Sequence, residues 1–199
     1  LQCHNSIVES YHRHGMARTF APADSATVLG DWSGAGSVHH APSNYTYTMV
    51  ARDGHRFVRE TRADSTGRVV HEVEKPVEFV IGSGDNDQGF AYEEAGGLYV
   101  LPVEWYRAKG VWDMAPGFES ARQERWKLPL LPGCFGCHAS IPDYVAESGN
   151  RYRAPLPNGI GCERCHGPGA LHVRARLSQP GRFASGAFDS TIANPERLS

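Results

Sequence analysis

The central part of the chain alternates between apolar and polar residues, as expected of β-strands with one buried face. The alternation begins in YTYTMVA (45–51) and resumes in HRFVRETR (55–62) after Asp53-Gly54, a strong signal for a two-residue hairpin turn. Four shorter runs bounded by glycine or proline follow: RVVHEVEK, VEFVIG, GFAYEE and LYVLPVEW. The pattern therefore predicts an antiparallel β-meander over residues 45–106.

Helical spacing of apolar residues appears on both sides of this region. It predicts a short amphipathic helix within residues 4–18 and a second helix in ALHVRARL (170–177). Glycine and proline together number 35 (22 + 13), which indicates many turns and irregular connections. The expected fold class is α+β.

Charge and length narrow the possible functions. The net charge of -2 and the absence of a basic run argue against a nucleic-acid surface. No apolar stretch is long enough to cross a bilayer. The chain begins with LQCHNS, without an initiator methionine or an apolar leader, and ends in the loop-like TIANPERLS, so we expect it to be a fragment of a longer protein.

Cysteine and histidine supply the candidate chemistry. The sequences CFGCH and CERCH are complete Cys-x-x-Cys-His motifs, the attachment signature of c-type haem. On a helical turn the three positions share one face, so two thiols can bind the porphyrin edge while the histidine ligates the iron. The opening LQCH has the form of a third motif cut after its first cysteine. The predicted haem-binding residues are Cys3, Cys134, Cys137, Cys162 and Cys165, with His4, His138 and His166 as proximal iron ligands.

Three other uses of these cysteines are weaker interpretations. A zinc ribbon places two Cys-x-x-Cys knuckles around one ion, but it does not need a histidine after each second cysteine. A thioredoxin-like redox pair would follow a strand in a βαβ pattern, which neither motif does. Cysteines three apart on one helical turn are poorly placed for a disulfide with each other.

Six stretches occur in an order typical of one family: CHNSIVESYHRHGMARTF, HAPSNYTYTM, LPVEWY, WDMAPGF, CFGCHASIP and GIGCERCHGPGALHV. In this order the chain resembles the multihaem cytochrome c family, within the broader group of nitrifier-type tetrahaem cytochromes, whose members often carry tetratricopeptide repeats. The resemblance implies covalent haem c, mostly bis-histidine irons, electron transfer, and a periplasmic or otherwise extracytoplasmic place in a bacterium.

The predicted elements and the positions of the motifs indicate an organisation for the chain. Short helices and irregular loops would surround covalent haems, with the β-meander inserted between them. We expect one multihaem domain made of a first haem segment (1–44), the β-meander insert (45–115) and a two-haem segment (116–199).

Two further histidines are candidate distal ligands. His172 follows His166 after a Gly-Pro-Gly turn, and six residues are too few to reach the opposite face of the same porphyrin, so His172 is assigned to a neighbouring haem. The family pattern places a histidine immediately before the x-Pro-Ser stretch, which is His40 here, with His39 as the alternative.

The chain departs from relatives at two places. Relatives often have Gly-Ser-Gly-x-His, whereas this chain has Asn86 at the histidine position. Other nitrifier-type cytochromes often place a histidine about ten residues after the first motif, and His12, His14 and Met16 lie near that place without a clean match. Arg164 and Arg174 are candidate partners of haem propionates.

Electron transfer through several haems is the leading function. The alternatives are a haem-based oxidoreductase of nitrogen or sulfur oxyanions, which needs one iron with an open axial position, and a haem-containing interaction or sensing module. The expected partners are redox proteins, neighbouring haem domains or tetratricopeptide repeats, with no nucleic acid and no membrane span in this fragment.

Overall fold

The computed structural model describes residues 3–24, 26–178 and 188–195. Leu1 and Gln2, which precede Cys3 in the predicted motif LQCH, lie outside the described residues. The fold is α+β, with antiparallel strands and few helices. The helical elements are α1 (Asn5–His12), the 3-10 helix η1 (Gly15–Arg18), the 3-10 helix η2 (Arg125–Lys127), α2 (Pro132–His138), α3 (Glu163–His166) and α4 (Ala170–Ser178).

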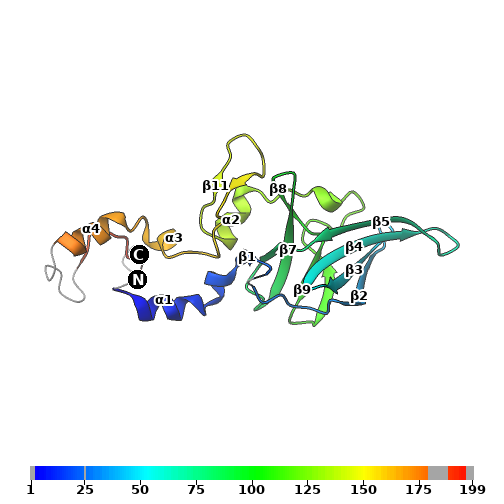
Figure 1. Ribbon diagram of the computed structural model, residues 1–199, viewed down its shortest axis with the longest axis horizontal. Coiled ribbons are helices and arrows are strands. Elements are labelled where there is room, and N and C mark those ends of the chain that lie inside the picture. Colours follow the sequence, from blue (N-terminus) through cyan, green and yellow to red (C-terminus); the bar gives the residue numbers. More distant parts are fainter. Residues whose placement is uncertain (1–2, 25, 179–187, 196–199) are drawn as a thin grey trace.

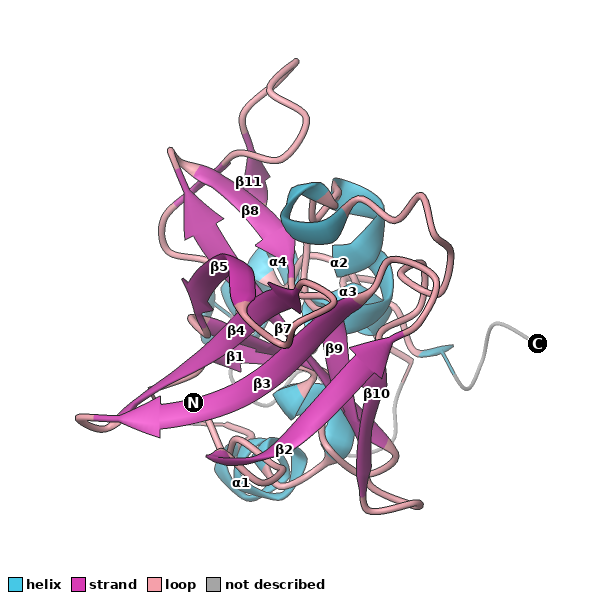
Figure 2. Ribbon diagram, turned by 90° about the vertical axis from the view of Figure 1, so that its right-hand side faces the viewer, coloured by secondary structure: helices cyan, strands magenta, loops and turns pink. Residues whose placement is uncertain are grey.

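One sheet contains four strands in sequence order: β2 (Ser33–His40), β3 (Tyr45–Arg52), β4 (His55–Ala63) and β5 (Val69–Pro76). These strands run side by side in Figure 2. The predicted hairpin is confirmed, because Arg52 pairs with His55 across the turn, and Asp53 and Gly54 have φ of 50° and 78°.

The second sheet has the order β1-β6-β7-β9-β10, with β8 also paired to β7. Its strands are β1 (Phe20–Pro22), β6 (Phe79–Ile81), β7 (Asp87–Glu94), β8 (Gly97–Val100), β9 (Val103–Tyr106) and β10 (Val111–Met114). The strand predicted in LYVLPVEW is divided at Leu101-Pro102, since β7 pairs with β8 near its end and with β9 near its start. The strands therefore form two sheets rather than one continuous meander.

A short hairpin of β11 (Asp143–Tyr144) and β12 (Tyr152–Arg153) follows α2. Phe135 of α2 is buried against the edges of Phe20 and Tyr152, with ring centres 5.0 Å and 4.9 Å apart. This contact anchors the first complete Cys-x-x-Cys-His motif to the sheets. A larger apolar cluster lies between the sheets and includes Trp32, Tyr47, Phe90, Leu101 and Trp126.

Helices α1, α3 and α4 lie together at one end of the molecule, away from the strands, with α2 between the two parts (Figure 1). None of these three helices contains a buried residue. The predicted helices within 4–18 and over 170–177 are present as α1 with η1 and as α4. Their apolar side chains stay largely exposed, among them Ile7, Leu171, Val173 and Leu177. This end of the protein has no apolar core of its own among the described residues.

Hydrogen bonds connect the N-terminal segment to the segment before α3. The Tyr11 hydroxyl donates to the carbonyl of Ile160 at 2.7 Å, and the Ile160 amide donates to Met16 at 2.9 Å. The amide of Gly159 donates to Phe20 at 2.8 Å. Within the described part of the chain, no helix has the length and apolar character needed to cross a membrane.

Candidate haem-binding site

The first complete motif occupies helix α2, which begins with Pro132 at its first turn. Proline suits this position because the amide it lacks has no partner within a helix. Cys134, Cys137 and His138 follow the i, i+3, i+4 spacing that gives three side chains one helix face. Cys134 is half-buried and Cys137 is exposed, so both thiols can reach a group bound beside the helix.

His138 is half-buried, and its Nδ1 atom is buried without a hydrogen-bond partner among the described residues. Burial lowers the pKa of His138, although the nearby Asp87 carboxylate opposes this shift. The ring is therefore neutral at pH 7, the form that can ligate a metal. The Nδ1 atom, which commonly donates a hydrogen bond when Nε2 ligates a metal, has no acceptor here among the described residues.

The second complete motif occupies the single turn α3. Its Cys162, Cys165 and His166 are all exposed. The Nδ1 atom of His166 lies 2.9 Å from the carbonyl of Ala193, to which it can only donate. This donation leaves the Nε2 lone pair for a metal ion. Gly167 ends the turn with φ of 72°, which confirms the bend expected from Gly-Pro-Gly.

The two motifs are held against each other. The Arg164 guanidinium donates to the carbonyl of Gly136, inside the first motif, at 3.3 Å. The amide of Gly161 donates to the Ser140 hydroxyl at 2.8 Å. These contacts join the two chain segments that carry the complete motifs. The described contacts of Arg174 include no carboxylate or carbonyl group.

His172 lies on α4, and its Nδ1 atom is 2.8 Å from Oδ2 of Asp189. The same carboxylate oxygen accepts from Arg176 at 2.8 Å. Hydrogen bonds lower the pKa of Asp189; those from Thr191 contribute most, and those from His172 and Arg176 contribute less. A carboxylate that accepts from Nδ1 fixes the ring orientation and leaves Nε2 as a basic metal ligand.

The fold brings His172 next to His4, 168 positions earlier in the sequence. Their ring centres are 6.1 Å apart and their planes are inclined by 23°. The two rings are stacked, so His172 lies beside a histidine that directly follows a cysteine. Cys3 is exposed beside His4. Cys3 and His4 thus lie close to His172.

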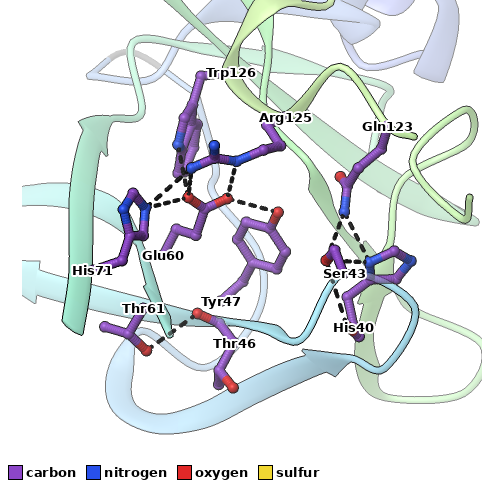
Figure 3. Close-up of polar contacts among 10 residues, drawn as sticks. All are labelled: His40, Ser43, Thr46, Tyr47, Glu60, Thr61, His71, Gln123, Arg125 and Trp126. Carbon is purple, nitrogen blue, oxygen red and sulfur yellow. Dashed lines mark hydrogen bonds and ion pairs between the residues drawn. The ribbon is translucent and has the colours of Figure 1, made fainter. Parts of the chain in front are cut away.

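His40 lies elsewhere, at the end of strand β2. Its ring is buried, and Nε2 lies 3.0 Å from the carbonyl of Glu119. Nδ1 lies 2.7 Å from the Ser43 hydroxyl (Figure 3). The Gln123 amide also approaches Nδ1, at 2.9 Å. Both ring nitrogens are engaged, so iron ligation by His40 requires these contacts to break and stays a prediction.

A buried polar cluster in the sheets was not predicted from the sequence. Glu60 of β4 is fully buried and accepts hydrogen bonds from Tyr47, His71, Arg125 and Trp126 (Figure 3). Burial alone would raise the pKa of Glu60, but these hydrogen bonds outweigh it and hold the pKa below its ordinary value. The strand alternation around Glu60 could have indicated that this carboxylate points inward.

The five cysteines are free. Among the residues that the structure describes, no three histidine, cysteine, aspartate or glutamate side chains converge into a metal-binding group. The four paired cysteines therefore do not gather around one ion as a zinc ribbon requires. Two separate thiol pairs, each followed by a histidine, fit haem attachment better.

Comparison with known proteins agrees with this chemistry. Residues 112–167 match the protein family described as cytochrome c554 and c-prime. The match includes both complete Cys-x-x-Cys-His motifs and begins in strand β10, so this part of the chain is similar to a c-type cytochrome. The similarity indicates haem c and haem-based electron transfer. No curated protein and no solved structure matches the chain.

Proposed function

We propose that the protein transfers electrons through several covalently bound c-type haems. Cys134 with Cys137, and Cys162 with Cys165, would each bind one haem, ligated by His138 and His166. The observation that carries the proposal is the direct contact between the two complete motifs, from Arg164 to Gly136. Haem iron supplies the one-electron chemistry, and motifs in contact favour short electron-transfer distances.

A third haem would be bound by Cys3, with His4 and His172 as the residues that would hold its iron. The stacked contact between the rings of His4 and His172 supports this pairing, because it brings the two imidazoles together. The hydrogen bond from His172 to Asp189 supports it further, because it holds the ring with Nε2 free. His172 would thereby join the segment after the second complete motif to the haem bound by Cys3.

Haem would also cover the apolar surface of the helical end. Large apolar side chains are rarely left exposed in a group, yet Ile7, Leu171 and Leu177 are 63%, 61% and 69% exposed. A porphyrin offers a flat apolar face for such side chains. The chain's contribution is to place the rings, exclude water from them and hold the imidazoles in one orientation.

Location and partners follow from the same proposal. Covalent attachment of haem c takes place outside the bacterial cytoplasm, so we place the protein in the periplasm or on the outer cell surface. The electrons would pass to redox proteins or to neighbouring haem domains, with tetratricopeptide repeats as a further part of the full-length protein.

Reductive titration followed by absorption and electron paramagnetic resonance tests the proposal. The account predicts low-spin, bis-histidine irons that reduce reversibly in successive steps. His172→Ala should convert one haem to a high-spin form, whereas His55→Ala, an exposed histidine of β4, should change no spectrum. A high-spin haem in the unaltered protein, with turnover of nitrite or sulfite, would favour the oxidoreductase alternative instead.

A further inference from the structure

A groove of about 520 Å³ separates the N-terminal segment from the turn between strands β6 and β7. One wall runs through η1 from Arg13 to Thr19, and the other is the turn Ser83–Asn86. The walls touch at Gly15, where a β-carbon would come within 2.6 Å of the Asp85 carboxylate. This close approach fixes the two walls relative to each other.

Two arginines line the groove without partners. Within the described part of the chain, Arg13 and Arg18 have no ion pair and no side-chain hydrogen bond, and both are exposed. Most arginines of the β-sheets, by contrast, contact a carboxylate or an aromatic ring, as Arg59 does with Glu74 and Arg62 with Tyr45. A guanidinium presents paired N–H donors that match the two oxygens of a carboxylate or oxyanion.

His14 adds a third donor to the groove. The amide of Met16 donates to Nδ1 of His14 at 3.2 Å, so the proton of the neutral ring is on Nε2. His14 therefore offers an N–H group in this arrangement, rather than the lone pair that an iron ligand needs. The side-chain amide of Asn86, which has no hydrogen-bond partner within the described residues, lies on the opposite wall.

One acidic residue faces these donors. Asp85 accepts from the Ser83 hydroxyl at 3.0 Å, and it offsets one of the two guanidinium charges. The groove retains a net positive charge and more donors than acceptors. Unpaired arginines beside a histidine N–H group and an amide make an environment that favours a small anion.

We propose that this groove binds a small anion with paired oxygens, held by Arg13 and Arg18 with help from His14 and Asn86. Two sources have this chemistry: a free oxyanion, or a propionate of the haem attached to α2. The second source rests on the proposed function. It is within reach because Thr19, which lines the groove, donates to the carbonyl of His138.

The test uses the full chain matured with haem, whose intact mass first establishes the haem content. Inorganic phosphate is the probe, titrated by calorimetry into the unaltered protein and into the double variant Arg13→Gln/Arg18→Gln. Arg122→Gln is the matched control, because Arg122 is exposed and also has no partner within the described residues. Haem midpoint potentials are measured for the same three proteins.

A free oxyanion predicts phosphate binding that weakens at least tenfold in the double variant and is unchanged in Arg122→Gln. If a propionate occupies the groove, phosphate should not bind to any of the proteins. The midpoint potential of one haem should then be lower in the double variant and unchanged in Arg122→Gln, because the two lost positive charges favoured the reduced state. Arg13→Lys/Arg18→Lys keeps the two positive charges, so this variant should retain part of the phosphate affinity or part of the higher midpoint potential. A misfolded protein would retain neither.

The proposal is overturned if the double variant binds phosphate as tightly as the unaltered protein, or if phosphate does not bind and every potential stays unchanged. A protein without attached haem would contradict the proposed function, but it would still test the groove through phosphate. The two failures are therefore distinguishable.

Discussion

At the scale of single residues, hydrogen bonds to the imidazole rings separate four of the histidines into two groups. His166 and His172 donate through Nδ1 to a carbonyl and a carboxylate, which leaves Nε2 free. His40 is engaged at both nitrogens, and His14 accepts at Nδ1. Only the first arrangement is ready for a metal ion without rearrangement.

The carboxylate behind His172 leads to a prediction about redox potential. Asp189→Asn removes the charged acceptor, so His172 becomes a weaker donor to iron and stabilises the oxidised state less. We expect the potential of one haem to rise by roughly 60 mV, equivalent to a tenfold change in a one-electron equilibrium. Asp143→Asn, at an exposed ion pair with Arg153, is the control in the redox titration. Equal titration curves for the two variants would contradict the role of Asp189.

A second prediction concerns Glu104 of β9, which is buried. Burial first, and then the Asp87 carboxylate, raise the pKa of Glu104 to about 7. The pKa of Glu104 is thus higher in the folded protein than in the unfolded chain. Between these two pKa values the folded protein holds a proton that the unfolded chain has lost. The free energy of unfolding therefore falls as pH rises from the ordinary pKa through about 7.

Glu104→Gln should therefore raise the free energy of unfolding by about 2–3 kcal/mol at pH 8 and leave it unchanged near pH 4. Urea denaturation across this pH range measures the difference, with Glu93→Gln, an exposed residue of β7, as the control. A gain that does not depend on pH would show that the carboxylate is already ionised in the folded protein.

At the scale of elements, the Glu60 cluster attaches the segment leading to α2 to the four-stranded sheet. Arg125 and Trp126 of η2 both contact Glu60, and Tyr92 of β7 donates to the carbonyl of Trp126. Arg125 itself has φ of 52°, a conformation that costs free energy and is kept by these contacts. The cluster thus helps to position the helix that carries the first complete motif.

Removal of the Glu60 charge should destabilise the protein strongly. Glu60→Gln leaves Arg125 partly buried without its carboxylate, and we expect a loss of about 3 kcal/mol in the free energy of unfolding. The matched change Glu72→Gln, at an exposed residue 3.9 Å from Arg59, should cost less than about 1 kcal/mol. Denaturation curves at pH 7 compare the two variants. Equal losses in the free energy of unfolding would show that the Glu60 cluster stabilises the fold no more than an exposed ion pair does.

The elements that the sequence predicts are those specified by local pattern. Strands β3 and β4 follow from alternation around Asp53-Gly54, and α1 and α4 from helical spacing. Strand β2 was missed, because SGAGSVHH contains two glycines and is mostly exposed, and it is held by pairing with β3. The double pairing of β7 with β8 and β9 likewise depends on contacts that no local pattern specifies.

The same distinction holds for the site. Both complete motifs could be found because a Cys-x-x-Cys-His turn is a local arrangement. The proximity of His4 to His172 arises only when the two end regions of the chain come together. The contact of Arg164 with Gly136 arises when the segment after α2 folds back on that helix. His172 was expected to serve a neighbouring haem, but its neighbour could not be named from spacing.

At the scale of the whole molecule, the apolar cores belong to the sheets and α2, whereas α1, α3 and α4 bury nothing. The two ends should therefore depend differently on haem. With all five cysteines replaced by serine, we expect hydrogen exchange to stay slow in β3, β4 and β7 and to accelerate in α1 and α4. Uniform acceleration across the sheets would show that the whole fold needs the cofactor.

The central claim is that the Cys-x-x-Cys-His motifs bind haem covalently, and intact mass spectrometry tests it most directly. The chain is produced in a bacterial periplasm together with the cytochrome c maturation machinery. The account predicts that the mass of the unaltered chain is raised by two haems, or by three if Cys3 also forms its bond. The variant Cys134→Ser/Cys137→Ser should lack one of these haems, and the variant Cys162→Ser/Cys165→Ser should lack another. An unchanged mass with stoichiometric zinc would contradict it.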